Sequence, residues 1–352
     1  MRFVHMADVH LGCIPDGKTE WGEKRSRELW ETFQSSLQDA GERKADLVLI
    51  AGDLFHTPPD ERRLREVSYL FSSFPHMCFA LIAGNHDYVS GESAWRTFHF
   101  PGNVALLGAE GCECITFGHI GTEVYGFSYN KPQIDRRLYD GLKPEDNDFF
   151  HILLAHGGDA QHIPYSPQEM SLSGFDYIAL GHIHKPQILL KNRAAYSGAL
   201  SPIDAGDEGP HGYIVGETAG HSVSLKFVPK ARREYVTMTV SVTEGDTTFS
   251  LRDTVARAIG QKGPENIYKI VLKGQRAPGV RFDTDLIGSA GLILSVDDQT
   301  SAAVHLDELR QRYHGQLIGR YIESFERKNL TEVEQKALQV GLEALLAGEN
   351  RK

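Results

Sequence analysis

The sequence predicts a layered α/β fold (an α+β sandwich): two sheets flanked by helices, then a small α/β domain and a helical C-terminal segment. Short apolar runs rich in β-branched residues recur as far as residue 180. Segments of helical character separate the first three runs, and alternating residues with glycine turns follow later. This order indicates a core of parallel strands with added hairpins.

Five apolar runs are the expected core strands, because such short runs are typical of strands buried on both faces. They cover residues 3–6, 47–50, 78–82, 152–154 and 177–180. Helices are expected over about 22–43 and 60–73, the second beginning after Pro58-Pro59-Asp60. From about 104 to 128 and from 187 to 228 the alternation predicts hairpins. Residues 1–230 therefore form the first predicted domain.

A second, smaller domain is expected over residues 234–300, where the pattern becomes β-α-β-α-β. Its elements are expected at 235–242, 251–259, 267–272, 285–289 and 292–296. Residues 301–352 are expected to be a helical segment, and Thr331 with Glu334 predicts a capping box at its last helix. The apolar stripe of that helix is expected to comprise Val333, Ala337, Leu338, Leu342 and Leu345. This stripe either packs on its own domain or docks a partner, and the sequence leaves both open.

Composition argues against two classes of protein, generic nucleic-acid binders and membrane proteins. The formal net charge of −10 argues against a generic nucleic-acid binder, although metal cations bound at a carboxylate-rich site would reverse its local field. No signal-peptide pattern and no apolar stretch of membrane-spanning length occurs, so no membrane partner is expected, and the four cysteines, without a disulfide-rich pattern, indicate a reducing cytoplasm. The cysteines form no CxxC pair, and Cys112 and Cys114 are expected to be buried on one face of a strand.

Five polar blocks carry the candidate chemistry. They are Asp8-Val9-His10, Gly52-Asp53, Gly84-Asn85-His86-Asp87, His156-Gly157 and Gly181-His182-Ile183-His184. Each follows an expected strand, and α/β sheets place ligand sites at the carboxyl ends of their strands. Mixed carboxylate, amide and imidazole ligands suit Mn²⁺, Fe or Zn²⁺. The blocks together predict a centre of two divalent metal ions that hydrolyses phosphoesters.

Spacing suggests how the ligands are shared. Asp53, which directly follows a buried strand, is expected to bridge the two ions. Asp8 and His10 lie two positions apart and can bind one ion. His182 and His184 repeat that spacing and can send one imidazole to each ion.

Asn85 and His156 remain as ligands of the second ion. His86 is expected to protonate or stabilise the leaving oxygen, with a metal-bridging hydroxide as nucleophile. Asp87 is expected to orient His86. Nine other histidines show no such context and are expected to have no role in the site: His5, His76, His99, His119, His151, His162, His221, His305 and His314.

The ordered blocks resemble the calcineurin-like metallophosphoesterase superfamily over roughly residues 1–230. The segments FVHMADVHLG, GDLFHTPP, GHIHKPQ and YSGALSPIDAGDEGPHGY are similar to the nuclease subunit of the bacterial SbcCD complex and its archaeal and eukaryotic repair-nuclease relatives. The resemblance implies two Mn²⁺ ions, the first held by Asp8, His10, Asp53 and His184. It implies that Asp53, Asn85, His156 and His182 hold the second.

Further properties are implied by the resemblance alone. His86 matches the catalytic histidine of the family, and His56, in GDLFH, matches a second active-site histidine. Members act on DNA as ATP-modulated exonucleases and endonucleases, work with an SMC-like coiled-coil ATPase of the SbcC type, and form homodimers. Their nuclease domain is followed by a capping domain and a helical segment.

The leading hypothesis is therefore a Mn²⁺-dependent DNA nuclease that acts in double-strand-break repair or DNA-end processing. One alternative is a phosphodiesterase for small nucleotides or a phosphomonoesterase. Another is a non-catalytic scaffold that recruits an ATPase, which would be expected to have lost metal ligands first.

Overall fold

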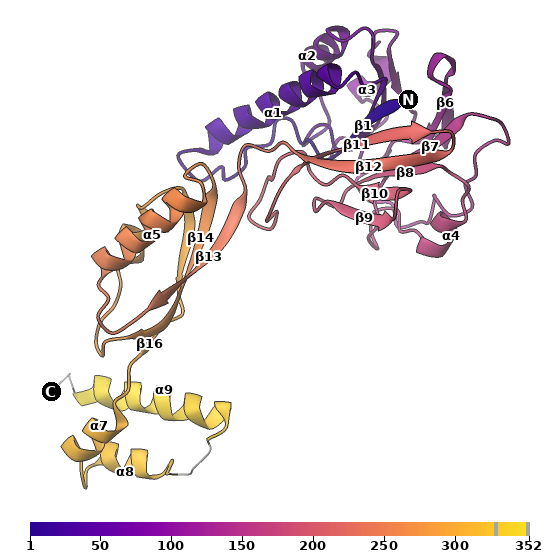
Figure 1. The fold of residues 1–352 in the computed structure, drawn as a ribbon. Coiled ribbons are helices and arrows are strands. Elements are labelled where there is room, and N and C mark those ends of the chain that lie inside the picture. Colours follow the sequence, from indigo (N-terminus) through magenta and orange to yellow (C-terminus); the bar gives the residue numbers. More distant parts are fainter. Residues whose placement is uncertain (327–329, 350–352) are drawn as a thin grey trace. The chain divides into compact units, whose positions relative to one another are not determined.

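The computed structural model describes residues 1–326 and 330–349 of the chain (Figure 1). The chain divides into two compact units, Met1–Tyr235 and Val236–Lys352. The boundary lies close to the end of the first predicted domain. The finer division of the second unit into residues 234–300 and 301–352 stays a prediction.

The first sheet of the larger unit has six strands in the order β12-β11-β1-β2-β3-β4. Its strands are β1 (Arg2–Met6), β2 (Leu47–Ala51), β3 (Cys78–Ile82), β4 (Val104–Leu106), β11 (Gly212–Ala219) and β12 (Ser222–Pro229). Strands β1 to β4 are parallel, and β11 and β12 form an antiparallel hairpin that adds to β1. The sequence predicted this parallel core and the final hairpin.

The second sheet also has six strands, in the order β5-β6-β7-β8-β10-β9. They are β5 (Glu113–Phe117), β6 (Thr122–Gly126), β7 (Phe150–His156), β8 (Tyr177–Gly181), β9 (Gln187–Leu190) and β10 (Ala194–Tyr196). The middle strands β6, β7, β8 and β10 are parallel, and the two edge strands are antiparallel. The predicted two-sheet α/β architecture is confirmed.

Alternating side chains of the strands build the layers. In β2, Leu47 and Leu49 lie in the apolar core between the two sheets, which they share with Ile152 of β7. Val48 and Ile50 point the opposite way and pack in the core beneath the helices. Because successive side chains of a strand alternate between faces, each sheet is covered on both sides.

Helices cover the first sheet. Helices α1 (Gly22–Glu42) and α2 (Glu61–Ser72) match the two predicted helices, and α3 (Ala94–Thr97) is a single short turn. The carboxylate of Asp60 caps α2 by accepting from the amide of Arg63 at 2.8 Å. On the second sheet, α4 (Pro167–Ser171) contributes Met170 to a separate core.

Cys112 and Cys114 are a correction to the sequence-based expectation. Both are exposed. Cys112 precedes β5, and β5 is an edge strand whose Cys114 side faces solvent. The residues of an edge strand are not obliged to be buried, which spacing alone could not reveal.

The second unit has the predicted β-α-β-α-β order. It comprises β13 (Tyr235–Val242), α5 (Thr248–Lys262), β14 (Ile267–Arg276), α6 (Thr284–Gly288), β15 (Ile293–Asp298), a short β16 (Ser301–Ala302), and then α7 (Leu306–Arg312), α8 (Leu317–Glu323) and α9 (Glu332–Glu349). The strands form one sheet in the order β13-β14-β15, and β16 pairs with β14. No helix among the described residues is long and apolar enough to cross a membrane.

The last helix begins with the predicted capping box, in which Thr331 Oγ1 accepts from the amide of Glu334 at 3.3 Å. Leu338 and Leu342 are buried in a cluster with residues of α8. Val333 and Ala337, expected in the same stripe, are exposed. Part of the apolar stripe is therefore used for packing within the unit.

Candidate metal centre

The five polar blocks meet at the carboxyl ends of neighbouring strands. Asp8 follows β1, Asp53 follows β2 and Asn85 follows β3, three adjacent strands of the first sheet. His156 ends β7 and His182 follows β8, adjacent strands of the second sheet. The structure thus brings all seven predicted metal ligands to one edge of the sandwich, as the strand order predicts.

Asp53 lies between two imidazoles at the centre of the cluster. Its Oδ2 atom is 3.4 Å from Nε2 of His156 and 3.9 Å from Nε2 of His10. Asp53, His10 and His156 are almost completely buried. One carboxylate flanked by imidazoles from two directions has the position that a ligand shared by two cations requires.

Asp8, His10 and His184 form one group of candidate ligands, whose ligand atoms lie within 4.8 Å of one another. The Nε2 atoms of His10 and His184 face each other at 3.1 Å. Two neutral imidazole nitrogens at this distance need a proton or a cation between them, since two lone pairs repel. This group fits one divalent ion.

The second group surrounds the amide oxygen of Asn85. This Oδ1 atom lies 2.9 Å from Nε2 of His156 and 3.1 Å from Nδ1 of His182. The other nitrogen of His156, Nδ1, is 2.8 Å from the carbonyl oxygen of Ala51, so that Nε2 is directed into the cluster. Together with Asp53, this donor set of nitrogen and oxygen atoms fits a second ion.

Unusual backbone conformations hold the ligands in place. Asp8, His10, Asp53 and His182 all have positive φ angles, of 49°, 51°, 52° and 95°. Residues other than glycine rarely adopt this region, and such strain clusters at functional sites. Gly84 is needed for a different reason, because a Cβ atom there would lie 2.8 Å from Cγ of Asp53.

The buried carboxylates and imidazoles of the cluster shift one another's pKa values. Burial alone would raise the pKa of Asp53, but the imidazoles of His156 and His10 hold it below its ordinary value. Burial lowers the pKa of His10 to about 3. Against the effect of burial, Asp53 raises the pKa of His156 to about 9, and Asp207 raises that of His184 to about 9. Ligation needs neutral imidazoles, so bound cations would replace these protons.

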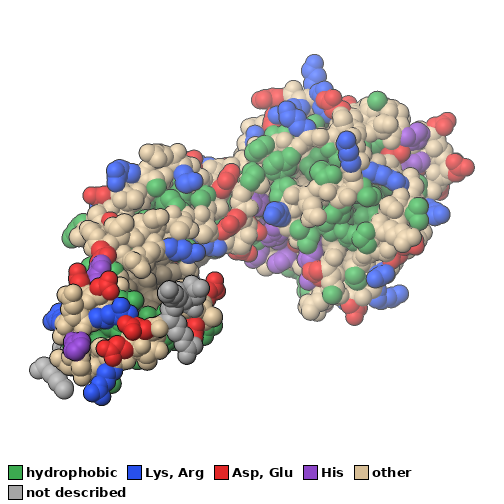
Figure 2. Space-filling view, turned by 60° about the horizontal axis from the view of Figure 1, so that its bottom comes forward, with side chains coloured by type: hydrophobic (Ala, Val, Ile, Leu, Met, Phe, Trp, Pro, Cys, Tyr) green, Lys and Arg blue, Asp and Glu red, His purple; other side chains and the backbone are tan. Residues whose placement is uncertain are grey.

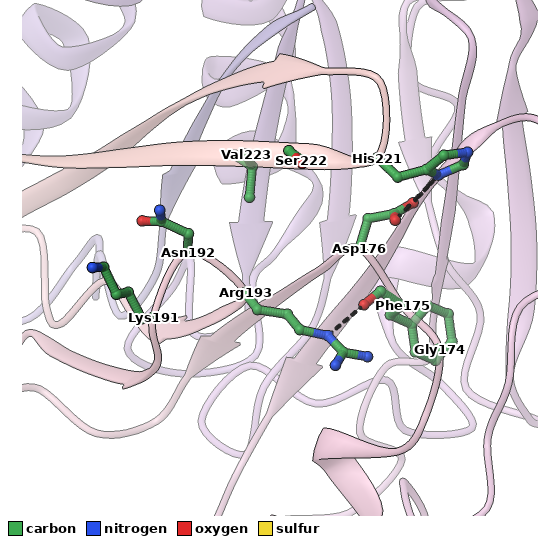
Figure 3. A pocket seen from close by; sticks show the side chains of 9 residues that line it. All are labelled: Gly174, Phe175, Asp176, Lys191, Asn192, Arg193, His221, Ser222 and Val223. Atoms are coloured by element: carbon green, nitrogen blue, oxygen red, sulfur yellow. Dashed lines mark hydrogen bonds and ion pairs between the residues drawn. The ribbon is translucent and has the colours of Figure 1, made fainter.

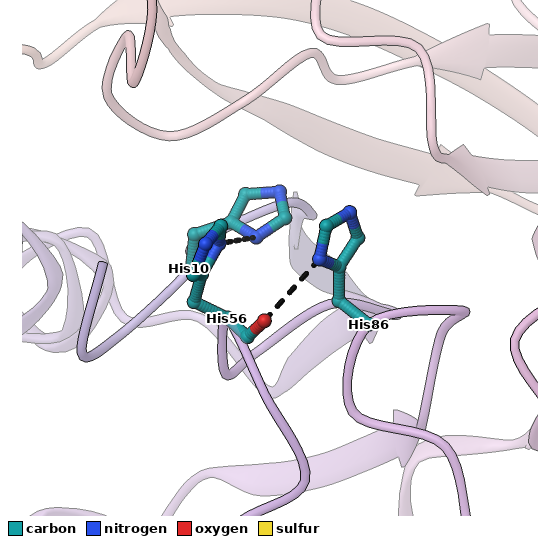
Figure 4. A group of neighbouring side chains, drawn as sticks. All are labelled: His10, His56 and His86. Atoms are coloured by element: carbon teal, nitrogen blue, oxygen red, sulfur yellow. Dashed lines mark hydrogen bonds between the residues drawn. The ribbon is translucent and has the colours of Figure 1, made fainter. Parts of the chain in front are cut away.

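Three histidines lie side by side (Figure 4): His10 is buried, and His56 and His86 form the rim of the cluster. The rings of His56 and His86 are stacked with centroids 5.2 Å apart, and Nδ1 of His56 is 3.4 Å from Nδ1 of His10. His86 is exposed, whereas His56 is half-buried. Figure 2 shows histidine side chains gathered at the surface of the larger unit. The rim can therefore reach a substrate that binds from solvent.

Asp87 does not orient His86, which corrects the sequence-based expectation. Its two oxygens accept from the backbone amides of Gly84 and Phe55, at 2.7 and 3.1 Å. The Nδ1 atom of His86 is instead 3.2 Å from the carbonyl oxygen of His56. Burial raises the pKa of Asp87 to about 7. Asp87 joins the two loops that carry His56 and His86, and does not touch the imidazole it was expected to orient.

Comparison with known proteins identifies the family. The family model for calcineurin-like phosphoesterases matches residues 1–186. The chain belongs to the calcineurin-like phosphoesterase family. The metal-dependent phosphoesterase class and the resemblance seen in the polar blocks are thereby confirmed.

Relatives of this phosphoesterase are found in bacteria and archaea. The uncharacterised metallophosphoesterase YhaO of Bacillus subtilis is 29% identical over 298 residues, which are 78% of this chain and 72% of that protein. The DNA double-strand break repair protein Mre11 of Methanocaldococcus jannaschii is 28% identical over 264 residues, covering 68% of this chain and 69% of that protein. Mre11 of Archaeoglobus fulgidus is 28% identical over 232 residues, and the aligned part is 51% of its length.

The phosphoesterase site contains residues that the sequence did not single out. Asp159 lies 2.7 Å from Nε2 of His182, and His162 is 2.9 Å from Asp159. Asp207 lies 3.1 Å from Nδ1 of His184. His162 was expected to have no role in the site, so its place beside His182 is a correction. Asp207 belongs to the segment YSGALSPIDAGDEGPHGY, which was the only available signal.

A separate hollow of the phosphoesterase unit contains none of the candidate ligands (Figure 3). It lies beside β12 and the turn before β10. Its Asp176 binds His221 at 3.1 Å, and Arg193 donates to the carbonyl oxygen of Phe175 at 3.0 Å. The side chains of Asp176 and Arg193 are therefore already engaged within this hollow.

Proposed function

We propose that this phosphoesterase is a dinuclear-metal DNA nuclease that hydrolyses phosphodiester bonds. The observation that carries the proposal is the continuous cluster of carboxylate, imidazole and amide groups that includes Asp53, with His86 exposed beside it. Mn²⁺ is the proposed metal. One ion would be held by Asp8, His10, Asp53 and His184, and the other by Asp53, Asn85, His156 and His182.

In the proposed mechanism, the metal ions activate the attacking water molecule and the histidines serve the leaving oxygen. Bound divalent ions would supply Lewis acidity and lower the pKa of a water molecule that attacks phosphorus. The Nδ1 atom of His86 donates to the carbonyl oxygen of His56, because a carbonyl can only accept. The Nε2 atom of His86 is the other ring nitrogen, and in the imidazolium form of the ring it carries the proton that the leaving oxygen takes. This transfer leaves a neutral ring that still donates from Nδ1 to His56. His56 stacks on His86 and limits its rotation.

DNA as the substrate is supported by relatives named for double-strand break repair. The net charge of −10 makes strong unaided DNA binding unfavourable, but cations at the site reverse the local field. A partner with its own basic surface would add affinity. We therefore include an SMC-like ATPase, a homodimer and end-processing activity in the proposal, with the unit Val236–Lys352 as cap and docking region.

The deciding experiment is a cleavage assay of the purified chain in Mn²⁺. Linear, hairpin and single-stranded DNA are compared with a cyclic nucleotide and a phosphomonoester, with and without a coiled-coil ATPase. The expected result is cleavage of DNA ends and single strands, lost in His86→Ala although elemental analysis still finds two ions. Turnover of the small substrates without DNA cleavage would instead assign a small-nucleotide phosphodiesterase or phosphomonoesterase. A chain that binds no metal even after soaking in Mn²⁺ would assign a scaffold.

A further inference from the structure

Two carboxylates outside the predicted ligand set lie against the two histidines of the GHIH block. An oxygen of Asp159 is 2.7 Å from Nε2 of His182. Both oxygens of Asp207 are 3.1 Å from Nδ1 of His184. Asp159 follows β7 and Asp207 precedes β11, so the two carboxylates reach β8 from different parts of the chain.

The two histidines turn opposite nitrogens towards the ligand cluster. His182 places Nδ1 3.1 Å from the amide oxygen of Asn85, whereas His184 places Nε2 3.1 Å from Nε2 of His10. A neutral imidazole has one N–H donor and one lone pair, and a carboxylate only accepts. The amide oxygen of Asn85 also only accepts, but the charged carboxylate of Asp159 is the stronger acceptor and lies closer to His182, at 2.7 Å against 3.1 Å. The N–H of each ring therefore faces its aspartate, and the lone pair faces the cluster, where a bound cation would accept it.

We infer that Asp159 and Asp207 are positioning residues that fix the tautomers of His182 and His184, one for each metal ion. This inference rests on the proposed dinuclear centre. A carboxylate behind a ligating histidine holds the ring orientation and strengthens the nitrogen that binds the metal. Without its aspartate, each ring could rotate or present an N–H to the ion.

The two aspartates differ in how firmly they are held. The side chain of Asp207 is 9% exposed, and one of its oxygens accepts from the amide of Ile203 at 2.9 Å. That of Asp159 is 46% exposed and is held by the amide of Gln161 at 2.8 Å and by Nδ1 of His162 at 2.9 Å. Since exposure weakens a charge-assisted hydrogen bond, loss of Asp207 should have the larger effect.

A third cation bound by Asp159, His162 and His182 is the competing explanation, because their ligand atoms lie within 4.8 Å of one another. Adjacent ligands of a six-coordinate ion with bonds of about 2.1 Å would be roughly 3.0 Å apart. The 2.7 Å between Asp159 and His182 is shorter and is typical of a charge-assisted hydrogen bond. The geometry favours the positioning role.

The test titrates the full-length, metal-free chain with Zn²⁺ and Mn²⁺ against a competing chelator. The variants are Asp159→Ala and Asp207→Ala, with Gln161→Ala and Asp204→Ala as controls from the same loops. Each aspartate variant should lose about 10–100-fold in affinity for one of two ions, and the controls should bind as wild type does. If an alanine variant fails to fold, Asp207→Asn or Asp159→Asn replaces it, with the same loss expected because an amide can impose the wrong tautomer.

Nitrogen-15 NMR of the Zn²⁺-loaded protein reports directly which ring nitrogen of each histidine is protonated. A purely structural role of the two aspartates would not fix these tautomers. It should show His182 protonated at Nε2 and His184 protonated at Nδ1. Wild-type affinity in both aspartate variants, or the opposite tautomers, would overturn the inference while leaving the dinuclear centre intact. A third ion that is lost in Asp159→Ala would overturn it for Asp159. A wild-type chain that binds no ion would overturn the proposed function, and the inference with it.

Discussion

Gly84→Ala should disable the proposed metal centre without removing any candidate ligand. Gly84 is buried immediately before Asn85, and its φ is not in the left-handed region, so alanine brings no backbone penalty there. An added Cβ atom would lie 2.7 Å from the backbone nitrogen of Asp53 and 2.8 Å from its Cγ. The effect of this variant is therefore purely steric.

The size of the effect follows from these distances. Ordinary contacts of a Cβ atom begin at 3.4 Å, so Cγ of Asp53 must retreat by about 0.6 Å (3.4 minus 2.8). Metal–ligand distances tolerate about 0.2 Å, and a displacement of about 1 Å in an active site costs roughly 10²-fold in rate. We expect kcat to fall about 10²-fold and the affinity for at least one ion to fall by tenfold or more. Overpacking should also cost about 1–3 kcal/mol of stability.

DNA cleavage in Mn²⁺, metal titration and thermal unfolding measure these three quantities. Gly91→Ala is the matched control, because Gly91 is exposed and a Cβ atom there meets nothing within 4 Å. Gly91→Ala should behave as wild type in all three assays. If Gly84→Ala also cleaved DNA and bound two ions like wild type, the close packing of Gly84 against Asp53 would not matter for the site, and the reasoning would be refuted.

Three further predictions concern the rim, the charges and the larger unit. His56→Ala should lower kcat about 10–100-fold with both ions retained, because His56 contacts the candidate ligand His10 and stacks on His86. Steady-state rates and elemental analysis test this prediction. The folded-state pKa values of His156 and His184 are raised to about 9. In the metal-free protein, protonation of these two imidazoles therefore adds to the free energy of unfolding. This addition is complete below about pH 6.5 and is lost as the pH rises towards 9. Melting temperatures in a chelator should fall across this window, and a flat profile would contradict the assignment. Arg233→Ala should cost about 3 kcal/mol in denaturant unfolding, at the low end for a broken buried pair. Arg233 binds the buried Glu28 at 2.5 Å, and after its loss the Glu28 carboxylate keeps only the more distant Arg25, at 3.4 Å, as a buried cation.

Periodicity in the sequence predicted most of the fold because each core strand is buried on both faces. Runs such as Leu47-Val48-Leu49-Ile50 have no other stable place than a covered parallel sheet, and they proved to be β2 and its neighbours. Edge positions were less predictable. Cys114 has the same alternation as a buried residue, yet it lies on an edge strand, and edge status is a property of the whole sheet.

The meeting of the candidate ligands at one edge was likewise predictable from the sequence. Polar residues such as Asp8, Asp53 and His156 follow strands that must run parallel, so their side chains had to arrive at one edge. The orientation of the imidazoles was not determined in this way. Spacing treats His182 and His184 as equivalent, although they present opposite nitrogens to the cluster.

Only the tertiary structure decided which carboxylates hydrogen-bond to the candidate ligands on the side away from the cluster. Asp87 was expected to orient its sequence neighbour His86, but its carboxylate binds two backbone amides. Asp159 and Asp207 lie 23 residues from the histidines that they contact, His182 and His184. A hydrogen bond between loops of this separation depends on where the chain returns in space, and local sequence carries no record of that distance. The sequence therefore determined which residues can bind metal, and the folded chain decided how each of them is aimed.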